Sequence, residues 1–208
     1  MTLKVYGRKS SCNVQKVTWL CSELNIDYET LDYGGRFGGT KDEHFKSLNP
    51  NSTVPLIDDD GFYLYESNAI IKYLSRKYKF LILKDEKIIA KRDQWMDWAG
   101  FTLAAPCATV TLNMFLLPEN KRDPSKVLKA KEQVFLLLNI LNNQLIYNNY
   151  ILGDDFSLAD IPAGCWYNRC KKFNFDFSKF DGINQWFSKL QKREAYNSNV
   201  ISAPLPPN

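Results

Sequence analysis

Two prolines, a glycine and a helix-starting serine leave few folds open to the stretch from Leu48 to Tyr73. Pro55 has no backbone donor, which confines it to the start or the edge of a strand. Turn-forming residues precede it, and an Asp-Asp-Asp-Gly run that is typical of a hairpin turn follows it. The stretch is therefore predicted to form a loop at 49–52, a strand at 54–57, a turn at 58–61, a strand at 62–65 and a helix from Ser67.

These elements predict a ledge for a small peptide. The Val54–Pro55 bond is of the kind that adopts the cis form most readily. A cis bond would turn the Val54 amide and carbonyl outward, where they could pair with an extended peptide. Glu66 and Ser67 stand at a helix N-terminus, where free amides and the helix dipole attract a carboxylate. The alternative interpretation is a hairpin packed on a helix without any ligand.

Val54-Pro55 followed by Glu66-Ser67-Asn68-Ala69-Ile70 resembles the glutathione-binding half of glutathione transferases. The resemblance implies that the peptide is glutathione, bound as a co-substrate, and it implies no metal. The implied glutathione contacts are Lys41, Thr53, Val54, Pro55, Glu66 and Ser67. In many members of the family a basic residue precedes the Val-Pro pair and meets the glycine carboxylate of glutathione. This chain has Thr53 there, so Lys41 or Arg8 would have to compensate.

The fold class predicted is an α/β thioredoxin-like N-terminal domain, with a mixed four-stranded sheet and helices, followed by an all-α C-terminal helical domain. Leu3–Tyr6, Cys12–Leu24 and Asp27–Leu31 read as strand, helix and strand. Strand signals nearly vanish after Tyr78, and the periodicity beyond it predicts two long helices, at 86–116 and 125–147. The expected divisions are a glutathione-binding domain at 1–79, a linker at 80–86 and a helical domain at 87–208.

The family resemblance places the chemistry at the start of the first helix. A free thiol has a pKa of about 8.5, so a transferase must favour the thiolate of glutathione. Ser11 stands where the first strand meets the first helix, as the serine does in serine-type members, and its hydroxyl would donate to the sulfur; Asn13 would be a supporting donor. The register also leaves Ser10 open. Ser10-Ser11-Cys12 resembles the Ser-Ser-Cys of the zeta class, whereas Ser11-Cys12-Asn13-Val14 resembles the Ser-X-Asn-Val of bacterial relatives and favours Ser11.

Two other functions compete with conjugation. Cys12 would support glutathione-dependent thiol–disulfide exchange or isomerisation, because a cysteine near a helix N-terminus has a lowered pKa. Cys12 lies one residue past the position expected for such members, and no second cysteine forms a Cys-X-X-Cys pair with it. The other competitor is a non-catalytic binding or regulatory protein. Retention of Val54, Pro55, Glu66 and Ser67 argues against it.

The second substrate is expected to lie against the helical half. The candidate wall residues are Trp98, Phe101, Met114 and Trp166. Their apolar character suggests a small apolar electrophile, although most aromatic residues on helices belong to the core.

Ser157 and Asp160 form a capping pair that predicts a helix start. The surrounding run from Gly153 to Ile161 resembles the structural capping motif in the helical domain of glutathione transferases. Its implied role is folding, and it is not catalytic.

Composition excludes several classes of function. The chain has 208 residues, a net charge of +4 and no basic run interleaved with aromatic residues, so nucleic acid is not an expected partner. It shows no signal-peptide core and no uninterrupted apolar segment that is expected to span a membrane. Five cysteines without metal-ligand spacing favour free thiols in the cytoplasm, and a single histidine, His44, cannot support a catalytic triad alone. The resemblance also implies a homodimer, in which Asp93 or Asp97 could reach the partner's site.

Overall fold

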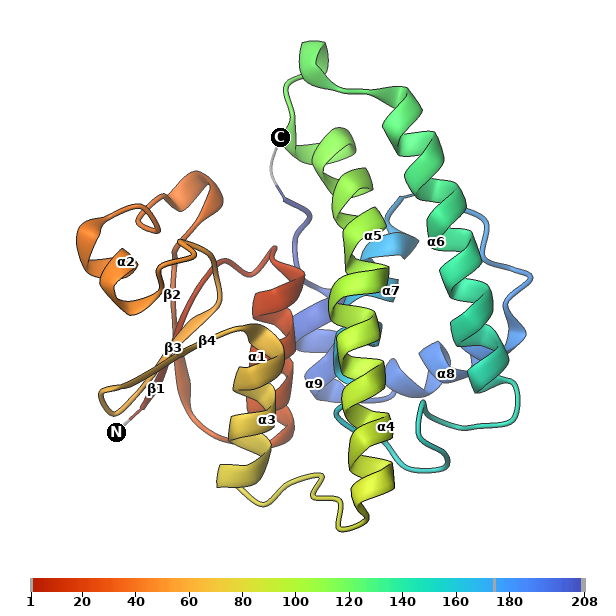
Figure 1. The fold of residues 1–208 in the computed structure, drawn as a ribbon, viewed down its shortest axis with the longest axis horizontal. Helices are drawn as coiled ribbons and strands as arrows, with labels where there is room; N and C mark the ends of the chain where they lie inside the picture. Colours follow the sequence, from red (N-terminus) through yellow and green to blue (C-terminus); the bar gives the residue numbers. More distant parts are fainter. Residues whose placement is uncertain (1, 174, 207–208) are drawn as a thin grey trace.

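The computed structural model describes residues 2–173 and 175–206 of the chain. Its first half contains a mixed sheet in the strand order β2-β1-β3-β4 (Figure 1). β1 pairs in parallel with β2 and antiparallel with β3, and β3 pairs antiparallel with β4. The strands are β1 (Leu3–Tyr6), β2 (Tyr28–Leu31), β3 (Leu56–Asp59) and β4 (Phe62–Tyr65). This is the predicted thioredoxin-like arrangement.

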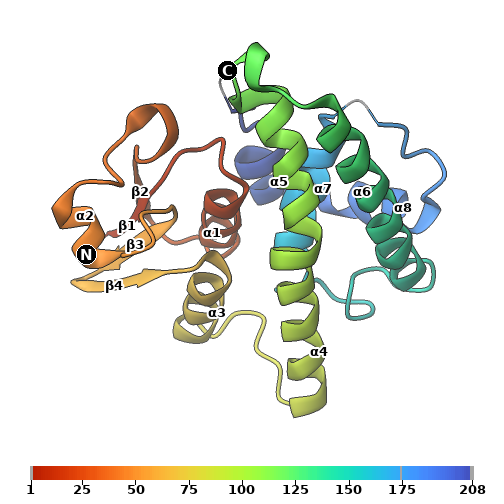
Figure 2. The same cartoon turned by 45° about the horizontal axis from the view of Figure 1, so that its top comes forward.

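Three helices accompany the sheet: α1 (Cys12–Glu23), α2 (Glu43–Leu48) and α3 (Ser67–Lys77). α1 and α3 lie between the sheet and the helical half of the chain, and α2 lies away from that half (Figures 1 and 2). On α1 the polar residues Gln15, Lys16 and Thr18 are buried along with the apolar residues. The reason is that α1 packs against β1 and α3 on one side and against α7 on the other.

The second half is helical, as predicted. A helical stretch runs from Glu86 to Leu116 and comprises α4 (Glu86–Asp97), a π-helical segment (Trp98–Leu103), α5 (Ala104–Thr111) and a second π-helical segment (Leu112–Leu116). Pro106 lies within this stretch, in α5. The chain stays helical there, and the departure from α-helical pairing precedes Pro106, which has no N–H to donate to the preceding turn.

The remaining helices pack around this long stretch. α7 lies at the centre of the helical half, and α6 covers α5 on the outer side (Figures 1 and 2). Their bounds are α6 (Pro124–Leu145), α7 (Asp160–Lys171), α8 (Asp181–Leu190) and α9 (Glu194–Tyr196), which continues into a π-helical segment (Asn197–Ile201).

The stretch from Glu86 to Leu116 contains an 18-residue window with a mean hydropathy of 1.4. By length and composition it could span a bilayer, so the expectation that the sequence holds no such segment is wrong. Of that window, 44% is buried inside the fold, where α5 packs against α6 and α7. Core helices of globular proteins share this length and composition, so the hydropathy of the stretch does not indicate a membrane role.

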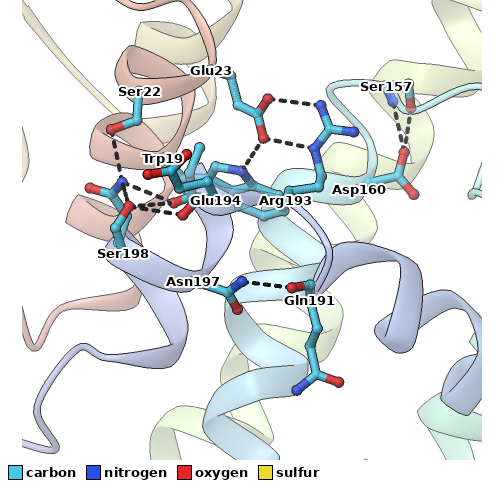
Figure 3. Close-up of polar contacts among 12 residues, drawn as sticks. Trp19, Ser22, Glu23, Ser157, Asp160, Gln191, Arg193, Glu194, Asn197 and Ser198 are labelled. Carbon is cyan, nitrogen blue, oxygen red and sulfur yellow. Dashed lines mark hydrogen bonds and ion pairs between the residues drawn. The ribbon is translucent and has the colours of Figure 1, made fainter.

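A polar cluster joins the two halves at the carboxyl end of α1 (Figure 3). Arg193 donates from Nε and Nη2 to the two carboxylate oxygens of Glu23, each at 2.7 Å. Trp19 Nε1 donates to the same carboxylate at 2.8 Å. This two-pronged ion pair fixes geometry as well as charge. It holds the carboxyl end of α1 against the C-terminal segment.

The predicted capping pair lies at the start of α7. The Asp160 carboxylate accepts from the backbone N–H and the hydroxyl of Ser157, both at 2.9 Å. It also accepts from the Ile151 N–H and from Trp186 Nε1, again at 2.9 Å. Asp160 is fully buried. One carboxylate therefore joins the α7 start, the preceding loop and α8.

Candidate active site

The β1–α1 turn and the Val54–Pro55 loop lie against each other. A Cβ added to Gly7 would lie 3.4 Å from Val54 Cβ, in ordinary contact, and 2.4 Å from Val14 Cγ2, so a larger residue here would force Val14 of α1 to shift. The Val54–Pro55 bond is cis. Beyond it, β3 pairs with β1 through Leu56 and Tyr6. The turn that carries Ser10 and Ser11 is therefore held next to the predicted peptide ledge.

Glu66 occupies an unusual backbone conformation at the start of α3. Its φ is 68° and its ψ is 107°, a region that residues other than glycine rarely adopt. Such outliers persist where the surrounding structure enforces them, and they concentrate at ligand-binding sites. Ser67 follows at the first position of α3 and is buried. The conformation of Glu66 thus marks the α3 N-terminus as a candidate carboxylate site.

Lys16 lies beneath this helix start. Its side chain is 1% exposed, and its Nζ donates to Ser67 Oγ at 3.2 Å and to Asn68 Oδ1 at 3.5 Å. Burial lowers the pKa of the Lys16 ammonium, while the charge of Glu66 acts in the opposite direction. An ammonium can only donate, so Ser67 Oγ must accept from Lys16. The Ser67 hydroxyl therefore keeps its own hydrogen for donation. In this structure it donates to Asn13 Oδ1 at 3.4 Å.

A hollow of about 340 Å³, which we call the α3 hollow, opens above these groups. Its lining includes Asn13, Lys16, Glu66, Ser67, Asp97 and Phe101. The π-helical segment after α4 forms its far wall. Asn68 Nδ2 donates to the Met96 carbonyl at 2.8 Å, and a Cβ on Gly100 would lie 2.9 Å from Asn68 Nδ2. α3 and the long helix therefore meet closely enough to form one binding surface.

Ser11 lies at the N-cap position of α1, with an extended backbone (φ −86°, ψ 121°). Within the described residues its hydroxyl makes no capping hydrogen bond, which leaves it free to donate elsewhere. Ser10 is buried, and its carbonyl accepts from Arg169 Nη2 at 2.6 Å. Both serines line a second cavity of about 200 Å³, the Ser11 cavity. Asn13 lines both cavities, so the two adjoin at the first turn of α1.

Cys12 points into the core. It is 5% exposed, and its thiol is directed to the Cys165 carbonyl at 3.8 Å. Burial raises the pKa of the Cys12 thiol, although the charges of Arg169 and Lys16 act in the opposite direction. A buried thiol with a raised pKa is a poor nucleophile. The geometry therefore favours a structural role for Cys12.

Comparison with known proteins identifies the family of this chain. The profile of the glutathione S-transferase N-terminal domain matches residues 1–76, and that of the C-terminal domain matches residues 104–194. A theta class glutathione S-transferase from Xanthomonas axonopodis pv. citri, solved with glutathione bound, superimposes with a TM-score of 0.92 at 30% identity over 97% of this chain and 98% of that one. The chain belongs to the cytosolic glutathione S-transferase family.

Two curated relatives align over nearly the whole chain. Glutathione S-transferase GstB of Escherichia coli (strain K12) is 29% identical over 203 residues, which are 96% of this chain and 98% of that protein. Glutathione S-transferase 3 of Zea mays is 27% identical over 224 residues, with 99% and 96% covered.

The structure of this glutathione S-transferase family member brings together most, but not all, of the predicted site residues. Ser10, Ser11, Cys12 and Asn13 surround the Ser11 cavity, and Glu66 and Ser67 line the α3 hollow. Thr53 is exposed, and its carbonyl accepts from Asn49 Nδ2 at 2.8 Å. Lys41 is exposed and lines neither cavity among the described residues.

The four residues predicted to form the wall of the second-substrate site lie in different parts of the structure. Trp166 lines the Ser11 cavity, whereas Phe101, 70% exposed, lines the α3 hollow. Trp98 packs edge-on against Trp95 at the margin of the core. Met114 lines a different pocket beside Arg122 and Val127. Only Trp166 remains as a wall residue beside Ser11, because α5 presents Ala108 and Thr111 to that cavity.

Two cations that line the cavities, Lys16 and Arg169, were not predicted as site residues from the sequence. Lys16 looked like an ordinary polar position on an amphipathic helix, and nothing in the sequence shows that α1 is enclosed on both sides. Arg169 did leave a signal. It is the one charged residue between Ile161 and Cys170, a run that is otherwise apolar or uncharged and is buried throughout. A lone cation in such a helix indicates a buried partner or a ligand.

Proposed function

We propose that this protein conjugates glutathione to an electrophile and that the Ser11 hydroxyl stabilises the glutathione thiolate. The observation that carries the proposal is the adjacency of the two cavities at Asn13. It allows one extended peptide to place a carboxylate at the α3 N-terminus and a sulfur at Ser11. The hydroxyl would donate to the sulfur, and the α1 N-terminus would add its dipole, so that the ionised form is favoured.

The remaining contacts with glutathione would come from the Val54–Pro55 ledge and from the α3 hollow. The Val54 amide and carbonyl would pair with the backbone of the peptide as a further strand. Ser67 and the free amides of α3 would receive the γ-glutamyl carboxylate, while Lys16 supplies a positive charge from below. Asp97, which lines the same hollow, would meet the amino group. The expectation that this acid comes from a partner subunit is therefore not needed.

Retention on immobilised glutathione, followed by rates with a panel of electrophiles and mixed disulfides, tests this proposal against its alternatives. Conjugation of electrophiles is the expected result. Exchange of mixed disulfides without conjugation would favour the Cys12 mechanism instead. Retention without either reaction would favour a non-catalytic binding protein.

Replacing Ser67 by alanine is expected to weaken glutathione binding by about 1–3 kcal/mol, the range for hydrogen bonds to charged groups. The physical reason is loss of a donor that Lys16 keeps available to the carboxylate. Titration calorimetry measures the change. Ser75→Ala is a matched control, because Ser75 lies further along α3 and donates to the Phe80 carbonyl. Equal affinities of Ser67→Ala and wild type would contradict the carboxylate site.

We also propose a cytoplasmic homodimer, the commonest closed assembly of soluble proteins. The five cysteines are free and buried, as suits a reducing compartment. Sedimentation at micromolar concentration is expected to give twice the chain mass of 24.1 kDa. A species of 24.1 kDa would reject the dimer. It would leave the proposed site intact, because Asp93 pairs with Lys72 and Arg92 of its own chain and Asp97 faces its own hollow.

A further inference from the structure

The Ser11 cavity is positively charged. Arg8 and Arg169 both line it, and its lining includes no aspartate or glutamate within residues 2–173 and 175–206. Neither guanidinium forms an ion pair with a described acidic side chain. A charge removed from water is costly unless it is paired. Arg8 is half-buried, so this cost falls mainly on Arg169, and a cavity lined by two cations and no described acid favours an anion.

Arg169 is the more buried of the two, at 4% exposed. Its Nη2 donates to the Ser10 carbonyl, which fixes the guanidinium beside the two serines. Besides the Ser10 carbonyl, the guanidinium faces the Cys12 thiol, and it carries five donors in a planar fork. The remaining donors suit a planar acceptor with two oxygens.

Arg8 adds a second charge from the opposite side. Its side chain lies along Gly34 and Gly35, where added Cβ atoms would approach its guanidinium to 3.1 Å. Burial lowers the pKa of Arg8, and the like charge of Arg169 acts in the same direction. Gly34 and Gly35 begin a glycine-rich segment that ends at Gly39. It forms a short 3-10 turn (Gly35–Phe37) that leaves room for this arginine.

Trp166 supplies an aromatic wall of the Ser11 cavity. It is 8% exposed and lines the Ser11 cavity, and its indole Nε1 has no hydrogen-bond partner in the described part of the chain. A buried indole N–H usually has an acceptor. The cavity thus combines an aromatic wall with two guanidinium groups and an excess of positive charge.

From these contacts we infer that the electrophile carries an anionic group, of carboxylate type, which Arg169 binds while the reacting carbon faces Ser11. This inference rests on the proposed transferase function and replaces the apolar electrophile that the sequence suggested. A cavity of about 200 Å³ suits one small ring or a short chain bearing that carboxylate. Trp166 would contact the apolar part of the molecule.

A matched pair of substrates tests the inference. In 4-chloro-3,5-dinitrobenzoate and its benzamide, the glutathione thiolate forms the C–S bond, the C–Cl bond breaks, and chloride leaves with the bonding electron pair. The thiol proton passes to solvent. The two compounds differ at a carboxylate that lies across the ring from the reacting carbon. Dividing each kcat/KM by the rate constant of the uncatalysed reaction with glutathione removes their intrinsic difference in reactivity.

We expect wild type to prefer the benzoate by about tenfold or more, the effect of one charge-assisted hydrogen bond. Arg169→Met is expected to abolish the preference, and Arg169→Lys to retain part of it. Arg76→Met, which removes an exposed charge at the end of α3, should keep it in full. Equal normalised rates for the two substrates in wild type would overturn the inference. So would an equal loss for both in Arg169→Met, because Arg169 would then act on the thiolate.

Binding of unreactive 3,5-dinitrobenzoate and 3,5-dinitrobenzamide, measured by calorimetry, tests the inference without turnover. The benzoate should bind about tenfold more tightly to wild type and lose this advantage in Arg169→Met and in Arg8→Met, which leaves the Ser10 contact in place. Equal binding of the two compounds to wild type would refute the anionic site. A preference for the benzoate in binding, with no conjugation of any electrophile, would refute the proposed transferase function alone.

Discussion

Ser11→Ala is expected to lower kcat by about 10- to 100-fold while the Kd for glutathione changes by less than about twofold. The hydroxyl is free of capping contacts within the described residues and lines the cavity where the sulfur would lie. Losing it removes one charge-assisted hydrogen bond to the thiolate and none to the peptide backbone. Initial rates with a neutral electrophile and calorimetric titration with glutathione measure the two quantities separately.

Two neighbouring variants act as controls for Ser11. Ser10→Ala is expected to have a smaller effect, because Ser10 is positioned through its carbonyl, which alanine retains. Cys12→Ala should leave the reaction largely unchanged, since the thiol faces the Cys165 carbonyl in the core. Full activity in Ser11→Ala together with lost activity in Cys12→Ala would overturn the serine assignment.

Asp160→Ala is expected to lower the free energy of unfolding by at least about 3 kcal/mol. The carboxylate accepts four hydrogen bonds, from Ser157, Ile151 and Trp186, and alanine leaves all four buried donors without that acceptor. Urea unfolding followed by circular dichroism measures the change. Asp155→Ala, in the exposed part of the same loop, should lie within about 0.5 kcal/mol of wild type. A loss below about 1 kcal/mol in Asp160→Ala would show that the network does not stabilise the fold.

The local elements of this fold could be predicted from sequence because their signals are local. Pro55 and the Asp-Asp-Asp-Gly turn predicted the β3–β4 hairpin, and the periodicity of the chain beyond Glu86 predicted the long helices. The capping pair Ser157–Asp160 is also a local signal. Its two further partners, Ile151 and Trp186, lie 9 and 26 residues away and could not be read from the motif.

The positive charge of the Ser11 cavity depends on contacts between segments that are distant in the sequence. Arg169 reaches the carbonyl of Ser10 across 159 residues, and Lys16 reaches Ser67 across 51. Residue type alone favoured an apolar electrophile, because Trp98, Phe101 and Met114 are large and apolar. Packing distributes these three among the core margin, the α3 hollow and a separate pocket. The space beside Ser11 is lined instead by two cations, Arg8 and Arg169.

We propose above all that the Ser11 hydroxyl keeps the sulfur of bound glutathione ionised as a thiolate. Ultraviolet titration of the thiolate absorbance of glutathione, bound to saturation, tests it most directly. We expect an apparent thiol pKa below about 7.5 on wild type, against about 8.5 for a free thiol, and a return toward the free value on Ser11→Ala. A bound thiol that keeps a pKa of about 8.5 on wild type, or the same lowered pKa on both proteins, would contradict the claim.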